Sequence, residues 1–167
     1  MSSESGSFDY DVVVIGGGSG GYAAARTAAG AGLKVAVIEG GQEIGGLCIL
    51  RGCMPTKALL HASDVLHQAQ RAAVWGIRAP QVGFDFTAVM ARKNAMIEDF
   101  ASYRRQQLTG GKFEFLRALA RFVDPHTLAL STGETVSAKN FVISTGSMMI
   151  HQLEGRIWPH RLKPDPV

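Results

Sequence analysis

Apolar residues near the start of the chain fall in two short runs, which are typical of strands buried on both faces of a sheet. Tyr10–Ile15 ends at a cluster of glycines. Leu33–Ile38 follows the alanine-rich stretch Gly20–Ala31, whose composition favours a helix. A strand, a glycine turn, a helix and a second strand in this order predict a parallel crossover unit.

Further along, apolar residues recur at steps of three and four, which predicts two longer helices. The first should run from Pro55 to about Val74, and the second from about Thr87 to Leu108 with Asp85 as its cap. We expect Arg104 and Arg105 to lie on a solvated face. The second helix carries a stripe that we expect to pack in the core, formed by Val89, Met96, Phe100 and Tyr103.

Beyond residue 111 the apolar period falls to two, which predicts strands separated by polar turns. The expected strands are Phe113–Val123, His126–Ser131 and Asn140–Ser144, and the expected turns are Asp124-Pro125 and Thr132-Gly133. The stretch from Met148 onward shows neither period, so we expect a loop or a frayed tail there.

Length and composition favour one globular domain. The 167 residues suffice for one sizeable core, and 46% hydrophobic with 19% charged residues is a usual balance for such a domain. We expect a disordered segment over residues 1–8, a domain over 9–147 and a divergent tail over 148–167.

Charge and targeting patterns exclude several classes of partner. The net charge of +3 is small, and the basic residues form no stripe interleaved with aromatic residues, so nucleic-acid binding is not expected. No apolar run approaches the roughly 18 residues that suggest a membrane span. The polar, acidic N-terminus does not resemble a signal peptide. The cytoplasm is therefore the expected compartment.

The glycine cluster after the first strand satisfies G-x-G-x-x-G through Gly16, Gly18 and Gly21. In such a turn the first glycine allows a sharp exit from the strand. The second lets the backbone approach a pyrophosphate at the positive end of the following helix, and the third lets that helix pack closely on the strand. Glu39 ends the second strand, where an acid can accept both ribose hydroxyls of an adenosine. The pattern predicts a dinucleotide site, and it serves NAD and FAD alike.

The only two cysteines, Cys48 and Cys53, lie close together in GGLCILRGCMPTK. A structural disulfide across so short a loop removes little unfolded-state entropy, about 2 kcal/mol. Zinc prefers four ligands, and beside the pair only His61 is a candidate, so no metal site is expected. A redox pair explains more of the neighbouring residues than either alternative.

Pro55 favours the first turn of a helix, which places Cys53 at or next to a helix N-terminus. The helix dipole there stabilises a thiolate, and Lys57 adds positive charge one turn along. Cys48 is expected in a flexible glycine loop, better placed to meet an incoming substrate. The two sulfurs are therefore expected to be unequal, one facing a cofactor and one facing solvent.

The segment from Gly45 to Lys57 matches GG-x-C-x4-C-x-P-[ST]-K in order and spacing. Together with the glycine turn, it resembles the N-terminal FAD-binding part of the pyridine nucleotide-disulfide oxidoreductases, which include dihydrolipoamide dehydrogenase, glutathione reductase and mercuric reductase. The resemblance covers about residues 9–147. It implies an α/β fold, a Rossmann-like three-layer FAD-binding domain with a parallel sheet and an added antiparallel β segment, incomplete relative to the family.

The resemblance also implies roles for individual residues. Cys48 would be the interchange thiol, Cys53 the charge-transfer thiol and Lys57 a catalytic residue near flavin N5. The segment from Ala120 to Leu130 resembles the one that meets adenine, and Ser144-Thr145-Gly146 resembles a turn after a strand of the family. The implied cofactor contacts are Gly16, Gly18, Ser19, Gly20, Gly21, Glu39, Gly46, Lys57, Ala120, Thr145 and Gly146.

The activity implied by the resemblance is electron transfer between NAD or NADP, FAD and a Cys48–Cys53 disulfide. That disulfide would then exchange with a small-molecule disulfide or dithiol, dihydrolipoamide being favoured. The complete family enzyme is expected to be a homodimer. This chain is far shorter than family members and has no second dinucleotide fingerprint, and none of its histidines matches the family's catalytic His-Glu pair.

Other functions remain open on the sequence alone. The chain could be a non-catalytic, truncated FAD-binding fragment, or a member closer to mercuric or glutathione reductase. Two further alternatives are an NAD dehydrogenase module, which has no need of the cysteine pair, and a structural or partner-binding domain that keeps only the fold.

Overall fold

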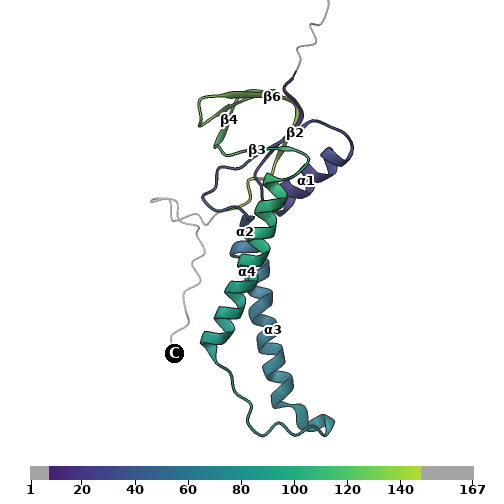
Figure 1. Cartoon of the computed structure of the whole chain (residues 1–167), viewed down its shortest axis with the longest axis vertical. Helices are drawn as coiled ribbons and strands as arrows, with labels where there is room; N and C mark the ends of the chain where they lie inside the picture. Colours follow the sequence, from purple (N-terminus) through teal and green to yellow (C-terminus); the bar gives the residue numbers. More distant parts are fainter. Residues whose placement is uncertain (1–7, 148–167) are drawn as a thin grey trace, which may run out of the picture.

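The computed structural model describes residues 8–147, which form one six-stranded sheet with helices beside it (Figure 1). The tail expected over 148–167, and all of the expected N-terminal segment except Phe8, lie outside the described residues. The strands are β1 (Tyr10–Ile15), β2 (Val35–Ile38), β3 (Glu114–Leu116), β4 (Ala120–Asp124), β5 (Thr127–Leu130) and β6 (Thr135–Ile143). The helices are α1 (Ser19–Gly30), α2 (Gly46–Leu50), α3 (Cys53–Gln70) and α4 (Phe86–Thr109), with a 3-10 turn η1 (Ala72–Trp75).

Strand β1 lies inside the sheet, whose order is β3-β2-β1-β6-β5-β4. Strands β2 and β6 both pair with it in parallel, and β3 pairs in parallel with β2, so the predicted crossover unit is confirmed. Parallel strands end at one edge, and the residues that follow them are bonded there. The Gly16 N–H donates to the Ile38 carbonyl at 2.7 Å, and the Ser144 N–H donates to the Ile15 carbonyl at 2.8 Å.

The other half of the sheet is antiparallel. Its pairing shows that two of the predicted strand boundaries are wrong. The expected single strand over Phe113–Val123 is wrong, because β3 and β4 pair with different partners, β2 and β5. Between them the Leu119 N–H donates to Ser131 Oγ at 3.0 Å, where the chain leaves one pairing for the other. Strand β6 begins at Thr135 instead of Asn140, because its first residues pair with β5 and its later ones with β1.

Apolar side chains on both faces of the parallel strands give the domain three layers. On one face Val14 and Val37 pack with Leu108 of α4 and with α1. On the other face Val13 packs with Leu128 and its neighbours from the antiparallel ribbon. These five side chains are fully buried. The expected α/β class, with a parallel sheet and an added antiparallel segment, is confirmed.

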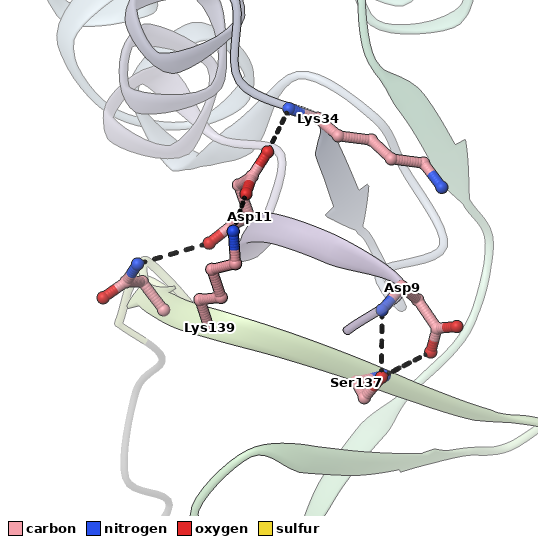
Figure 2. A network of polar contacts seen from close by, with 6 residues as sticks. Asp9, Asp11, Lys34, Ser137 and Lys139 are labelled. Carbon is pink, nitrogen blue, oxygen red and sulfur yellow. Dashed lines mark hydrogen bonds and ion pairs between the residues drawn. The ribbon is translucent and has the colours of Figure 1, made fainter. Parts of the chain in front are cut away.

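A network of polar contacts joins the start of β1 to its two neighbours, at the sheet edge opposite the glycine turn (Figure 2). The Asp11 carboxylate accepts from the Lys34 N–H at 2.9 Å and from Lys139 Nζ at 2.7 Å. The Asp9 carboxylate accepts from the Ser137 N–H at 2.8 Å and from its hydroxyl at 2.7 Å. Bonds from Ser137 hold the pKa of Asp9 below its ordinary value, and the Lys139 ammonium does the same for the pKa of Asp11.

Helices α3 and α4 extend away from the sheet as an antiparallel pair, joined by η1 and the loop that follows it (Figure 1). We call α3, η1 and α4 together the helical arm. The first predicted long helix ends at Gln70, before Val74, and the chain continues in η1. The predicted cap of the second is confirmed, because Asp85 Oδ1 accepts from the Ala88 N–H at 3.1 Å.

The core stripe predicted along α4 is wrong for its aromatic members. Phe100 is 42% exposed and Tyr103 is 59% exposed, whereas Val89 and Met96 are half-buried. Along this length α4 packs against α3 and α2, and the end of the helix reaches the sheet, where Leu108 packs with Val14 and Val37. The predicted helix is therefore present, but within residues 8–147 no other element covers the side of it on which Phe100 and Tyr103 lie.

Arg104 does not lie on the solvated face that we expected, although Arg105 forms an ion pair with the exposed Glu98. The Arg104 guanidinium carbon lies 4.1 Å from the centre of the Tyr22 ring on α1. Its Nε and Nη1 are buried and have no acceptor among residues 8–147. The contact with the ring face supplies part of the attraction that a carboxylate would otherwise provide.

Candidate functional site

The glycine turn between β1 and α1 is built so closely that side chains cannot enter it. Gly16 has φ +105°, and a Cβ there would lie 2.2 Å from the Ser144 carbonyl oxygen. A Cβ at Gly21 would lie 1.8 Å from the Gly16 carbonyl oxygen. At Gly18, by contrast, the nearest atom to a Cβ would be 3.7 Å away. The first and third glycines are therefore needed for the turn itself, and the second leaves backbone open to a ligand.

The first turn of α1 offers N–H donors to that opening. The Tyr22 N–H is bonded to the Gly18 carbonyl at 2.9 Å, so the N–H groups of the residues between them precede the helical ladder. No side-chain cap bonds to this helix end, and its first turn contains no acidic residue. Ser19 and Gly20, both exposed, thus stand at the positive end of a helix that can bind an anion.

Glu39 lies at the end of β2, beside this turn. Its Oε2 accepts from the Gly17 N–H at 2.8 Å, and its Oε1 accepts from the Gly41 N–H at 2.7 Å. Each carboxylate oxygen keeps a second lone pair, which can accept a hydrogen bond from a hydroxyl group. Leu119 packs on Gly40, so Ala120 at the start of β4 follows a segment that borders the Glu39 loop.

The segment after β6 runs past the same turn. The Ser144 carbonyl faces Gly16, and Ser144 Oγ lies 3.0 Å from where a Cβ of Gly20 would be. Thr145 and Gly146 are exposed beyond it. The edge of the parallel sheet thus brings together three of the predicted sets: the glycine turn, Glu39, and Thr145 with Gly146. The predicted Ala120 is next to Leu119, which borders the Glu39 loop.

The two cysteines stand on different helices, and both are thiols. Cys53 is the first residue of α3, as predicted, and it is exposed to solvent. Cys48 is half-buried within the short helix α2, so the flexible loop expected for it is wrong. The glycines on either side end the helix instead of loosening it: Gly45 precedes α2 with φ +148°, and Gly52 precedes α3.

Contacts between the two thiols perturb Cys48. A hydrogen bond with the Cys53 side chain, and then burial, raise the pKa of the Cys48 thiol. Hydrogen bonding by the Cys53 N–H and the Ser19 hydroxyl acts on this pKa in the opposite direction and more weakly. Lys57 is exposed on α3, one turn after Cys53. The arrangement is a close, unequal dithiol at the start of a helix.

Helix α2 connects the dithiol to the glycine turn. A Cβ at Gly46 would lie 2.6 Å from the Gly18 Cα, so the two backbones touch directly. Sequence patterns did not single out this contact, nor Gly17 as the donor to Glu39. Gly17 follows directly from the parallel pairing of β1 with β2, but the Gly46 contact depends on how α2 settles on α1.

Within residues 8–147, no group of three or more histidine, cysteine, aspartate and glutamate side chains could hold a metal ion. In the same range, no helix combines the length and the apolar character needed to cross a bilayer.

Comparison with known sequences decides the family. The sequence pattern described as pyridine nucleotide-disulphide oxidoreductase matches residues 10–161, most of the chain. The protein belongs to this family. Its sequence is 41% identical to dihydrolipoyl dehydrogenase of Thermus scotoductus, over 83% of this chain and 29% of that protein. It is 38% identical to leghemoglobin reductase of Vigna unguiculata, over 86% of this chain and 28% of that protein.

A solved structure gives the same family fold. The HOCl-induced flavoprotein disulfide reductase RclA from Escherichia coli superposes with a TM-score of 0.66 and 28% sequence identity, covering 86% of this chain and 30% of that one. The Rossmann-like fold of the FAD-binding domain of these oxidoreductases is thereby confirmed. The chain spans under a third of the length of the relatives it matches.

Proposed function

We propose that residues 9–147 form the FAD-binding part of a disulfide oxidoreductase, in which electrons pass between a nicotinamide cofactor, FAD and a Cys48–Cys53 disulfide. One observation carries the proposal. The backbone contact between Gly46 and Gly18 holds α2, the helix that carries Cys48, against the open end of the glycine turn. A dinucleotide bound along this edge would have its phosphates at one end of the contact and the two sulfurs at the other.

The residues present fit FAD. Its pyrophosphate would bind the N–H groups of Ser19, Gly20 and Gly21, which precede the helical ladder, where the helix dipole favours negative charge. Its adenosine ribose would bind the remaining lone pairs of Glu39, whose carboxylate is already oriented by two N–H groups. The implied contacts also include Gly16, Gly18, Gly46, Ala120, Thr145 and Gly146.

FAD, when bound, supplies the two-electron chemistry that links a nicotinamide to sulfur. The protein's own part is the thiol chemistry. Reduction of the Cys48–Cys53 disulfide takes two electrons and two protons and leaves two thiols. In the reverse direction the Cys48 thiolate attacks an external disulfide, whose sulfur–sulfur bond breaks as a mixed disulfide forms and the departing sulfur takes a proton. The Cys53 thiolate then attacks Cys48, which forms the Cys48–Cys53 disulfide and releases the second external sulfur as a thiol.

We assign unequal roles to the two sulfurs and to Lys57. Cys53, at the start of α3, would face the flavin as charge-transfer thiol, and Lys57 would lie near flavin N5. Cys48 would be the interchange thiol that meets the substrate. Dihydrolipoamide is the favoured dithiol, since the named relatives include dihydrolipoyl dehydrogenases. A homodimer is proposed for the complete enzyme.

A second candidate is a flavin-binding protein without turnover. The chain covers 29% of the dihydrolipoyl dehydrogenase it matches. Under this alternative the 167-residue chain binds FAD, and NADH oxidation with lipoamide stays at the background rate. Binding of FAD is common to both candidates, so it is tested first.

Titration of the purified chain with FAD, followed by flavin fluorescence, tests the binding site. Gly21→Ala should abolish binding, because its Cβ would collide with the Gly16 carbonyl and distort the phosphate turn. Glu39→Gln should weaken binding about tenfold or more, the scale of one hydrogen bond to a charged group.

Gly30→Ala is the matched control. Nothing lies within 4 Å of a Cβ there, so this variant should bind FAD like the parent chain. Far-ultraviolet circular dichroism establishes that each variant is folded. A folded Gly21→Ala variant that binds FAD normally, or a folded parent chain that does not bind FAD, would contradict the proposal.

A further inference from the structure

Tyr22 connects the glycine turn to the helical arm. Its N–H donates to the carbonyl of Gly18, the cap residue of α1, at 2.9 Å and so begins the hydrogen-bond ladder of that helix. Its hydroxyl donates to Gln107 Oε1 on α4, also at 2.9 Å. The backbone of Tyr22 therefore belongs to the turn that would bind the cofactor phosphates, whereas its side chain is held by the arm.

Arg104 holds the same aromatic ring from its face. It lies three residues before Gln107 on α4, so both side chains project from one side of that helix. The guanidinium carbon of Arg104 lies 4.1 Å from the centre of the Tyr22 ring. The attraction between a cation and a ring face is stronger where water is excluded, and Nε and Nη1 of Arg104 are both buried.

The charge of Arg104 is not explained by packing alone. Neither Nε nor Nη1 has an acceptor among residues 8–147, and a guanidinium does not lose its proton in a protein. Burying a charge without a hydrogen-bonded partner costs free energy, which an apolar side chain packed on Tyr22 would avoid. The neighbouring Arg105 differs, because it forms an ion pair with the exposed Glu98.

We propose that Arg104 is a positioning residue for the cofactor site: by stacking on Tyr22, it fixes the first turn of α1 so that its N–H groups face the phosphates. Donors that are already fixed lose less conformational freedom when a ligand binds, so this order should raise affinity. The link to FAD rests on the proposed function, whereas the order that Arg104 imposes on the turn does not.

Hydrogen exchange of the full chain without flavin, followed by NMR, tests that order. The Tyr22 N–H exchanges when the first turn of α1 opens, whereas an N–H inside the sheet, such as that of Val14, requires a larger opening. Arg104→Met should speed exchange at Tyr22 relative to Val14 by about three- to tenfold, the scale of one cation–π contact closed to water.

The FAD titration tests the consequence for the cofactor. Arg104→Met should weaken FAD binding by about three- to tenfold, and Arg104→Lys, which keeps a cation for the ring, should restore part of the affinity. Arg105→Met is the matched control, because it removes the same charge from the next residue, which pairs with Glu98 instead. It should bind FAD like the parent chain, which separates the stacking from the change in net charge.

A double substitution tests whether Arg104 acts through Tyr22. Tyr22→Leu removes the ring and should itself weaken FAD binding. Adding Arg104→Met to Tyr22→Leu should then cause no further loss, because the contact is already gone. Two independent effects would instead multiply.

Each result supports or overturns the proposal. It is overturned if folded Arg104→Met exchanges Tyr22 relative to Val14 as the parent does, if Arg104→Lys binds FAD no better than Arg104→Met, or if the two losses multiply. Should Arg104→Met fail to fold, Arg104→Gln also removes the charge and must show the same effects. A parent chain that does not bind FAD would contradict the proposed function, and the exchange result would still decide whether Arg104 orders the turn.

Discussion

The sheet and the helical arm are both rich in apolar residues, but they bury them to very different extents. In the sheet Val13, Val14 and Leu128 have no exposed surface. At the far end of the arm Val74 is 74% exposed and Trp75 is 81% exposed. A hollow of about 650 Å³ opens beside these two residues, away from the glycine turn. The sheet thus contributes to a fully buried core, whereas the apolar residues at the end of the helical arm lie on the surface.

This difference shows what a hydrophobic period can and cannot report. A period fixes which residues share a face of a helix or strand, because it follows from backbone geometry. Whether that face is buried depends on another helix or strand that packs against it, and the period carries no information about that partner. For β1 the second element is α1 on one side and the antiparallel ribbon on the other. For α4 the main covering elements are α3 and α2.

Truncating one apolar side chain in each region tests the comparison most strongly. Leu128→Ala should lower the free energy of unfolding by about 2–5 kcal/mol, since a buried leucine leaves a cavity. Trp75→Ala, at a position 81% exposed, should change it by about 0.5 kcal/mol or less. Urea unfolding followed by circular dichroism measures both. Equal losses would contradict the distinction between core and surface.

A smaller effect should appear as the pH is lowered. The pKa values of Asp9 and Asp11 are lowered in the folded protein by Ser137 and Lys139, so these groups stabilise it fully above their unfolded value. That contribution is lost as the pH falls below about 4 and through the folded pKa values. Urea unfolding across this range should therefore show stability falling with acid.

The matched variants assign that effect to the sheet. Asp9→Asn should flatten the fall in stability below about pH 4. Asp64→Asn replaces an exposed carboxylate on α3 and should leave the fall unchanged. If Asp64→Asn flattened it instead, the acid sensitivity would belong to the helical arm and the role assigned to the Asp9 network would be wrong.

Much of the fold could be predicted because it is locally encoded. Strand β1, helix α1 and the Asp85 cap each depend on residues within one segment. The single strand expected over Phe113–Val123 failed because its alternation continues across the point where the chain changes partner. Nothing in the alternation distinguishes pairing with β2 from pairing with β5, which is a tertiary choice.

The site divides in the same way. The position of Cys53 at a helix start follows from Pro55, and the meeting of the glycine turn with Glu39 follows from the parallel crossover. Placement of Cys48 in a helix could not be predicted, since five residues between glycines give no readable period. Stacking of Arg104 on Tyr22 was equally hidden, because it joins residues far apart in sequence.

The central claim, that one sulfur of the pair faces the flavin, is tested most directly by absorbance of the reduced protein with FAD. The account predicts a long-wavelength charge-transfer band that Cys53→Ser abolishes and Cys48→Ser retains. A band that survives Cys53→Ser and disappears in Cys48→Ser would reverse the assignment. Absence of any band in reduced parent protein with FAD bound would contradict the claim outright.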